Sequence, residues 1–155
     1  QVPRTAQAQQ AGLLAARALQ QLEAPDDARQ ALHFVRDRAA DPGVVAAARL
    51  RLAALELQAG QYEAALQALA ADMPPEFAAL AADRRGDVLL AQGQTDAARQ
   101  AYLQAWTAMD EAVDYRRVIE AKLNALGLDP SAPAAPANEA TPATPAAPPV
   151  TETSQ

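Results

Sequence analysis

Few side chains in this sequence are of the types that carry out chemistry. It has no cysteine, and its one histidine, His33, lies between two apolar residues. Since a metal site needs several converging ligands, we interpret His33 as a packed or half-exposed helix residue. Asp83 and Asp87 are four residues apart, so they share a helix face and could pair as acid and base. No nucleophile accompanies them, and we favour carboxylates that are solvated or bound to Arg84 or Arg85.

The charge and the missing motifs exclude several other classes of function. The formal net charge is −6 and the sequence pI is about 4.7, so the chain would repel nucleic acid, which requires a basic face. The sequence contains no glycine-rich phosphate loop, serine-centred elbow or zinc-ligand spacing. We therefore predict a protein that is not an enzyme and that has no catalytic residue, cofactor, metal site, nucleic-acid partner or small-molecule substrate.

The elements that position these residues follow from an internal repeat between Arg49 and Met109. Its second copy follows the first at an offset of 33 residues, counted from Gly60 to Gly93. A period of about 34 residues, with two helices around a glycine turn, is typical of tetratricopeptide repeats. We expect the small residues in equivalent positions, Ala53 with Gly86 and Ala65 with Ala98, to mark close helix crossings. The larger residues Leu69 and Tyr102 also match, and we expect them to fill the space between hairpins.

A further repeat precedes these two. When Ala31 and Val35 are matched with Ala65 and Leu69, at an offset of 34, this first repeat begins near Gly12. The apolar periodicity and the Pro and Gly breaks predict seven helices. They span about residues 8–23, 27–39, 44–58, 62–71, 76–92, 95–110 and 111–126.

We predict an all-α fold: a tetratricopeptide-like right-handed superhelix of about three helical hairpins plus a C-terminal capping helix. An irregular helical bundle is the alternative. We expect Asp26 or Asp27 to cap the second helix, and Gly60 to end the third in a left-handed conformation. Residues 1–128 form the predicted domain. Residues 129–155 form a predicted disordered, Pro/Ala-rich tail, with a docking motif as the alternative.

In such a superhelix, the first helix of each repeat lines the inner groove. Leucines beside acids there would suit an extended apolar or basic segment, such as an unfolded client. The alternative is that three repeats curve too little and that the seventh helix fills the groove. Tyr102 and Trp106, four residues apart, are interpreted as core, with a peptide anchor as the alternative. The predicted partner-binding residues are Leu13, Gln20, Leu50, Leu57, Leu80, Asp83, Asp87 and Leu90.

Three segments of the chain resemble one known family. They are residues 81–106 (AADRRGDVLLAQGQTDAARQAYLQAW), residues 48–69 (ARLRLAALELQAGQYEAALQAL) and residues 119–127 (IEAKLNALG). The first contains an Asp-x-Arg-Gly-Asp step from Asp83 to Asp87, which leads through two leucines to Gly93. This pattern resembles the periplasmic domain of the YfgM-type ancillary subunit of the bacterial SecYEG translocon.

The resemblance implies a non-catalytic protein at the bacterial inner membrane, with its tetratricopeptide domain facing the periplasm. The implied partners are the SecYEG translocon and a PpiD-like periplasmic chaperone, during protein export. The implied membrane anchor is a single N-terminal helix that would precede Gln1. Two alternatives stay open: a generic tetratricopeptide adaptor of the bacterial envelope, for example in outer-membrane assembly, and an enzyme.

Overall fold

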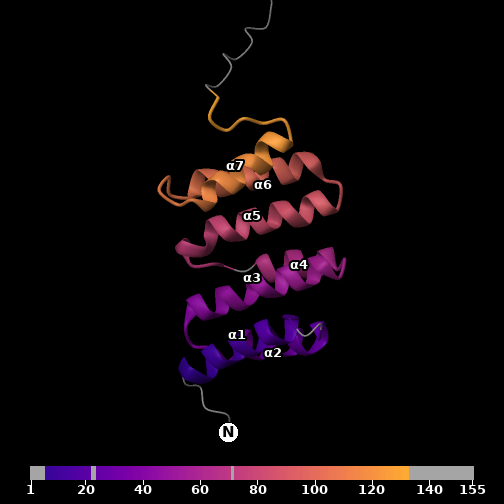
Figure 1. Cartoon of the computed structure of the whole chain (residues 1–155), viewed down its shortest axis with the longest axis vertical. Coiled ribbons are helices and arrows are strands. Elements are labelled where there is room, and N and C mark those ends of the chain that lie inside the picture. The colour runs from indigo at the N-terminus through magenta and orange to yellow at the C-terminus, as the bar shows by residue number, and fades with distance from the viewer. Residues whose placement is uncertain (1–5, 22–23, 71, 133–155) are drawn as a thin grey trace, which may run out of the picture.

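The chain folds into a stack of helices in a computed structural model (Figure 1). The structure describes residues 6–21, 24–70 and 72–132, with the backbone alone given at 6–9 and 19–21. Within these ranges there are seven helices and no strand. The helices are α1 (Ala6–Gln21), α2 (Pro25–Arg38), α3 (Pro42–Gln58), α4 (Tyr62–Leu69), α5 (Pro75–Ala91), α6 (Thr95–Ala108) and α7 (Tyr115–Ala125).

The helices pair as hairpins, and the hairpins stack in chain order. The hairpins are α1–α2, α3–α4 and α5–α6, and α7 closes the stack against α6. The first helices of successive hairpins touch, since α3 contacts both α1 and α5. Each second helix also contacts the next first helix, as α2 does with α3 and α4 with α5. Figure 1 shows this succession along the long axis of the molecule. The predicted all-α repeat architecture is therefore confirmed.

The small residues of the repeat lie at the helix crossings, as predicted. Ala53, Ala65 and Ala98 are each 0% exposed. Gly86 is also buried, and a Cβ atom built on it would lie 2.5 Å from Cδ1 of Tyr102. Since real Cβ atoms do not approach so closely, α5 and α6 can pack at this distance only with glycine at position 86.

The register predicted for the first hairpin is wrong by three residues. The buried positions there are Ala16, Ala28, Leu32 and Val35, whereas Ala31 is only half-buried. The spacing of the first three repeats that of Ala53, Ala65 and Leu69 in the second hairpin. The true offset between these hairpins is therefore 37 residues (16 to 53) instead of 34.

The backbone at the start of each second helix confirms this register. The N-cap residues Ala24, Gln61 and Gln94 have nearly the same ψ angle, at 68°, 67° and 66°. Each of their carbonyls accepts the first helical hydrogen bond, from Ala28, Ala65 and Ala98 respectively. The extra residues of the longer offset are accommodated at the far end of the hairpin, because α2 runs six residues past Leu32, whereas α4 ends at Leu69 itself.

The first helices end in one recurring turn. Gly60 and Gly93 have φ angles of 71° and 76°, as predicted for Gly60, a conformation that glycine adopts without strain. After each, an N–H reaches back five residues: Gln61 donates to the Glu56 carbonyl, and Gln94 to that of Leu89. The end of α7 repeats this hydrogen bond, because Leu128 donates to Leu123.

Helix α7 thus ends in the same way as the first helix of a repeat. A new helix begins two residues after Gly60 and Gly93, but residues 128–132 form none. The position on α7 that corresponds to Ala53 and Gly86, seven residues before the turn glycine, is occupied by Glu120. A charged side chain there prevents the close approach of a second helix, so the sequence of α7 suits a cap.

Three predicted helix starts are corrected by the structure. Helix α2 begins at Pro25 and has no side-chain cap. Asp26 and Asp27 instead lie in its first turn, where their negative charges interact favourably with the positive end of the helix dipole. Helix α3 begins at Pro42, because Oδ1 of Asp41 accepts hydrogen bonds from the backbone N–H groups of Gly43 and Val44 in its first turn. Helix α7 begins at Tyr115 instead of residue 111, since residues 110–113 form a hydrogen-bonded turn.

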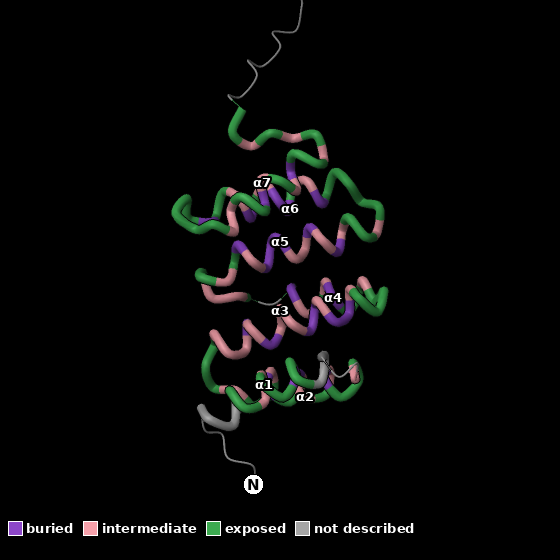
Figure 2. Tube along the Cα trace, viewed as in Figure 1, coloured by how far each residue is buried: buried purple, intermediate pink, exposed green. Residues whose placement is uncertain are grey.

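Burial follows the hairpins. Figure 2 shows buried residues recurring along α3 and α5, while the turns at the ends of the hairpins are exposed. The core divides into three apolar clusters, centred on α1–α3, α3–α5 and α5–α7. None of the helices in the described ranges is both long and apolar enough to cross a membrane. Most of the predicted tail, residues 133–155, lies outside the described residues.

Candidate protein-binding surface

The leucines predicted to line a groove lie on the first helices of the three hairpins. Leu13, Leu50, Leu57 and Leu80 are half-buried, and each packs partly against an apolar cluster of the core. Leu90 is the most open, at 39% exposed. These five leucines, which we call the leucine face, therefore combine anchored side chains with surface that a partner can reach. The side chain of Gln20 lies outside the described residues.

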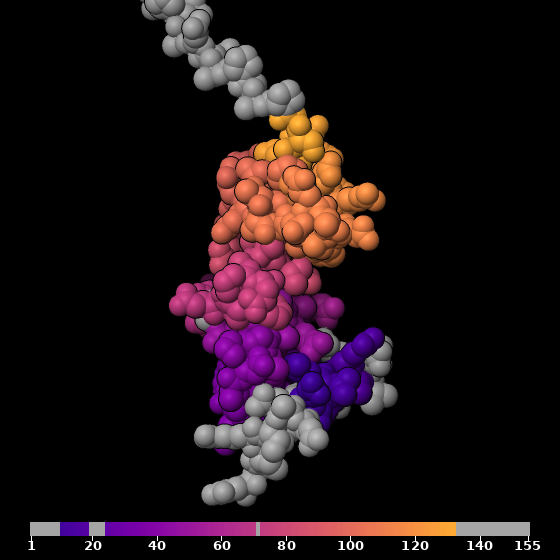
Figure 3. All heavy atoms as spheres, turned by 90° about the vertical axis from the view of Figure 1, so that its left-hand side faces the viewer, coloured from indigo at the N-terminus to yellow at the C-terminus, as the bar shows by residue number. Residues whose placement is uncertain are grey.

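One side of the stack is recessed between two projecting ends. In the turned view of Figure 3, the outline is recessed between α1 (indigo) and the C-terminal residues of the stack (orange). Helices α3 and α5, which carry four of the five leucines, lie in the middle of the stack. A recessed surface between two ends suits an extended segment better than a flat one does.

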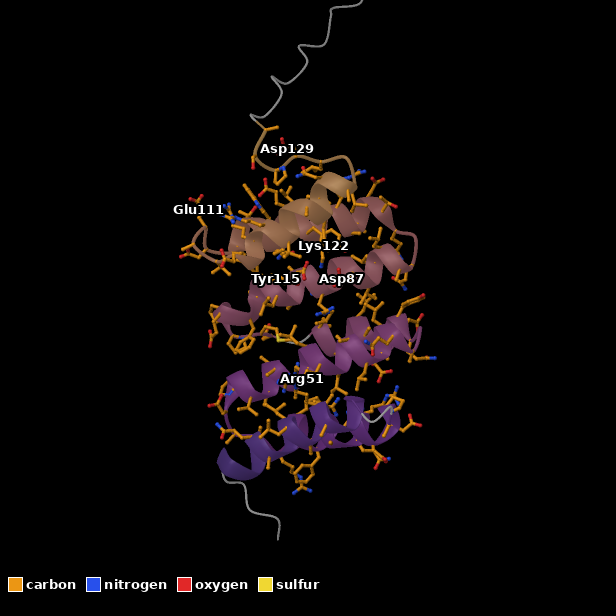
Figure 4. The ribbon with its side chains drawn as sticks, viewed as in Figure 1. Arg51, Asp87, Glu111, Tyr115, Lys122 and Asp129 are labelled. Carbon is orange, nitrogen blue, oxygen red and sulfur yellow. The ribbon has the colours of Figure 1, made fainter. Side chains whose placement is uncertain are left out.

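The two predicted groove acids form a buried polar cluster with α7. The ammonium of Lys122 lies 2.7 Å from Oδ1 of Asp83 and 2.7 Å from Oδ1 of Asp87. The hydroxyl of Tyr115 donates to the other oxygen of Asp83, at 2.9 Å. Asp83 is 2% exposed. Figure 4 shows Asp87, Tyr115 and Lys122 close together between α5 and α7.

Asp87 ties this cluster to α6 and to its own helix. The hydroxyl of Tyr102 donates to Oδ1 of Asp87 at 2.8 Å, and Nη1 of Arg84 lies 3.1 Å from Oδ2. The α5–α7 lock, as we name Asp83, Asp87, Tyr102, Tyr115 and Lys122, therefore joins three helices. Each donor in it is aimed at a carboxylate oxygen, so the buried charges are both paired and hydrogen-bonded.

The protonation of the lock reflects this pairing. Burial by itself would lower the pKa of Lys122, but its hydrogen bonds to Asp83 and Asp87 outweigh that effect and raise it. Burial raises the pKa of Tyr115, and the charge of Asp83 raises it further. The pKa of Tyr102 is raised in the same way, by burial and by its hydrogen bond to Asp87. At neutral pH the lock therefore keeps a charged lysine and neutral tyrosines.

This geometry changes the interpretation of Asp83 and Asp87. Asp83 is buried and Asp87 is half-buried, with 19% of its side chain exposed. Of the two neighbouring arginines, Arg84 binds Asp87, and no ion pair among the described residues joins Arg85 to either acid. Their main partner, Lys122, lies 39 and 35 residues later in the chain. No local spacing indicates such a pair, so sequence reasoning missed both Lys122 and Tyr115. Because these carboxylates hold α7, we leave them out of the partner-binding surface.

The aromatic pair on α6 belongs to the core, as interpreted from the sequence. Tyr102 is 1% exposed, and Trp106 is half-buried against the α5–α7 cluster. The guanidinium of Arg116 lies 3.9 Å from the centre of the Trp106 ring, and its Nε donates to the Trp106 carbonyl. This cation–π contact holds α7 on α6.

Similarity to known proteins covers most of the chain. The ancillary SecYEG translocon subunit of Neisseria gonorrhoeae (strain ATCC 700825 / FA 1090) is 33% identical over 124 residues, which are 80% of this chain and 59% of the relative. The chain thus spans about three-fifths of the length of that curated relative. No solved structure matches this chain. Residues 1–128 match the model of the tetratricopeptide repeat-like domain. Together with the stacked hairpins, this match shows that the chain belongs to the tetratricopeptide repeat-like family.

Proposed function

We propose that this chain is the protein-interaction domain of an ancillary translocon subunit at the bacterial inner membrane. In this role it faces the periplasm, binds the SecYEG translocon and a PpiD-like chaperone during protein export, and catalyses no reaction. The observation that carries the proposal is the match, over 124 residues, to a protein named as an ancillary SecYEG translocon subunit. The repeat fold supports it, because stacked helical hairpins present extended surfaces to other proteins.

The leucine face is the proposed partner-binding surface. Four of its five side chains pack against the core on one side, so binding an apolar segment would cost little of their conformational freedom. The leucines lie on successive first helices, so an extended chain can contact them in order along the stack. A polypeptide that is exported in an unfolded state presents such apolar segments, whereas a folded protein buries them.

Crosslinking of the full-length protein in membranes tests the proposed partners. We expect translocon subunits, or a membrane-anchored periplasmic chaperone, to be recovered with the protein after identification of the bound chains. Recovery of outer-membrane assembly proteins in their place would favour the generic envelope adaptor. Recovery of neither group would contradict the proposal.

Charge substitution on the leucine face tests the surface. Leu57→Arg and Leu90→Arg should each reduce the yield of crosslinked partner about tenfold, because a buried unpaired charge at an interface costs more than 1.4 kcal/mol. Phe34→Arg is the matched control, since Phe34 is 41% exposed and lies on α2, a second helix. If the leucine variants fold and capture partners as well as the control does, binding uses another face.

A further inference from the structure

A cavity of about 430 Å³ lies between α2, α3 and α4, away from the leucine face. Its polar lining comes from all three helices: His33 and Arg36 from α2, Arg49 and Glu56 from α3, and Gln67 from α4. A cavity of several hundred cubic ångströms accommodates a ligand of drug or short-peptide size. In a chain of net charge −6, a cavity lined by two arginines and a histidine is unusual.

The one acid of this cavity does not neutralise its arginines. Both carboxylate oxygens of Glu56 are bound by Arg29, which lies outside the lining, at 2.7 Å from Nε and 3.3 Å from Nη2. That hydrogen bond raises the pKa of Arg29. Arg36 pairs through Nε with Asp37, whose side chain is 55% exposed. The positive charge of the cavity therefore stays in excess.

Arg49 is the residue that gives the cavity its chemistry. Its Nε is buried, and within the described part of the chain no group accepts a hydrogen bond from it. None of the ion pairs among the described residues includes Arg49. A buried donor on a charged group is normally satisfied. Since Nε itself is enclosed, a ligand in the cavity would reach Arg49 through its Nη groups.

We propose that this cavity binds a carboxylate of an acidic peptide segment from a partner protein. The two Nη groups of a planar guanidinium can donate to the two oxygens of a carboxylate, and Arg49 is the arginine of the lining that has no ion pair among the described residues. His33 and Gln67 add donors to the lining, and Arg36 adds charge. Inorganic phosphate offers the same oxygen acceptors, so the test must separate the two sources. The proposal stands independently of the translocon assignment, because it rests on the cavity alone.

The test is a titration of the ¹⁵N-labelled chain with short peptides, followed by backbone amide shifts. The probe is an acetylated, amidated Gly-Glu-Glu-Gly peptide. Its matched control is the Gly-Gln-Gln-Gly peptide, which has the same shape without charge. We expect the glutamate peptide to shift the amides of His33, Arg49 and Gln67 and the glutamine peptide to leave them unchanged. Inorganic phosphate, titrated separately, should bind less tightly than the glutamate peptide.

Two variants of the cavity arginines and one control variant identify the cation. Arg49→Gln should weaken binding of the glutamate peptide at least tenfold, whereas Arg85→Gln, a half-buried arginine of α5 outside the cavity, should change it less than twofold. Arg36→Gln should weaken binding severalfold, and this variant keeps the test valid if Arg49→Gln unfolds. Three results would each overturn the proposal. They are equal losses of affinity for the glutamate peptide in the Arg36 and Arg85 variants, amide shifts confined to residues outside the cavity, and binding of phosphate without binding of the glutamate peptide.

Discussion

At the N-terminal end of the stack, α2 meets α3 mainly through apolar side chains. At the C-terminal end, α5 meets α7 through buried charges. The first contact buries Leu32, Val35 and Leu52 in one cluster. Among the described residues, a single ion pair joins the two helices, from Arg29 to Glu56. The second places the ammonium of Lys122 between two carboxylates, one of which is fully enclosed.

This difference explains why one end tolerates a change of register and the other requires specific residues. Apolar burial has no preferred direction, so the first hairpin can pack at an offset of 37 residues where the next uses 33. Buried charges are stable only with their partners at hydrogen-bond distance. The α5–α7 lock therefore specifies where α7 lies, and the four predictions below compare the two ends.

The largest effect is expected from Lys122→Met, which leaves Asp83 buried without a cation and leaves Asp87 with Arg84 alone. We expect the free energy of unfolding to fall by about 3–5 kcal/mol, as for other buried pairs that lose one partner. Urea denaturation followed by circular dichroism measures it. Arg117→Met, an exposed site on the same helix, should change it by less than about 0.5 kcal/mol. In an Asp83→Leu background, the cost of Lys122→Met should shrink, and simple additivity would contradict the lock.

Gly86→Ala should cost about 1–3 kcal/mol, because the new methyl group would overlap the Tyr102 ring. The sign is informative, since alanine in place of glycine within a helix otherwise stabilises by about 1 kcal/mol. Thermal unfolding of the variant measures the change. The same substitution in a Tyr102→Leu background recreates the Ala53–Leu69 pair of the second hairpin and should cost less. A stabilised single variant would show that the two helices can separate freely.

Arg29→Met should cost about 1 kcal/mol at the N-terminal end. It leaves Glu56, which is 8% exposed, without its main partner, but water can still reach the edge of the pair. The matched control is Arg36→Met, whose partner Asp37 is exposed, and its effect should stay within about 0.5 kcal/mol. Urea denaturation of both variants gives the comparison. A cost as large as that of Lys122→Met would remove the distinction between the two ends.

The smallest effect near neutral pH is the pH dependence itself. The pKa of Lys122 is raised above its ordinary 10.5, and that of Tyr115 above 10.0. A raised folded pKa contributes stability that is present below the unfolded value and is lost as pH rises through the folded value. We therefore expect a melting temperature that changes little from about pH 7 to 9 and falls above about pH 10.5. In Lys122→Met the alkaline fall should be smaller, and a wild-type fall beginning below pH 8 would contradict the assignment.

Much of the fold follows from short-range patterns. The turn glycines, the proline breaks and the 33-residue offset predicted the hairpins, and the equivalent small residues predicted the crossings at Ala53 and Gly86. The first hairpin was misplaced because Ala31 and Ala28 are both alanines, so composition could not distinguish a register from one shifted by a single turn. The leucine face does not depend on that misplacement, because Leu13 lies 37 residues before Leu50, and its role in binding stays a prediction.

The sequence by itself determined the helices and their turns, because these depend on propensity, glycine conformation and periodicity within one repeat. Only the tertiary structure decided that Lys122 pairs with Asp83, 39 residues away, and that Arg49 faces a cavity. The physical reason is distance along the chain. Local patterns set the conformation of each segment, whereas a buried charge is assigned its partner by how the hairpins stack.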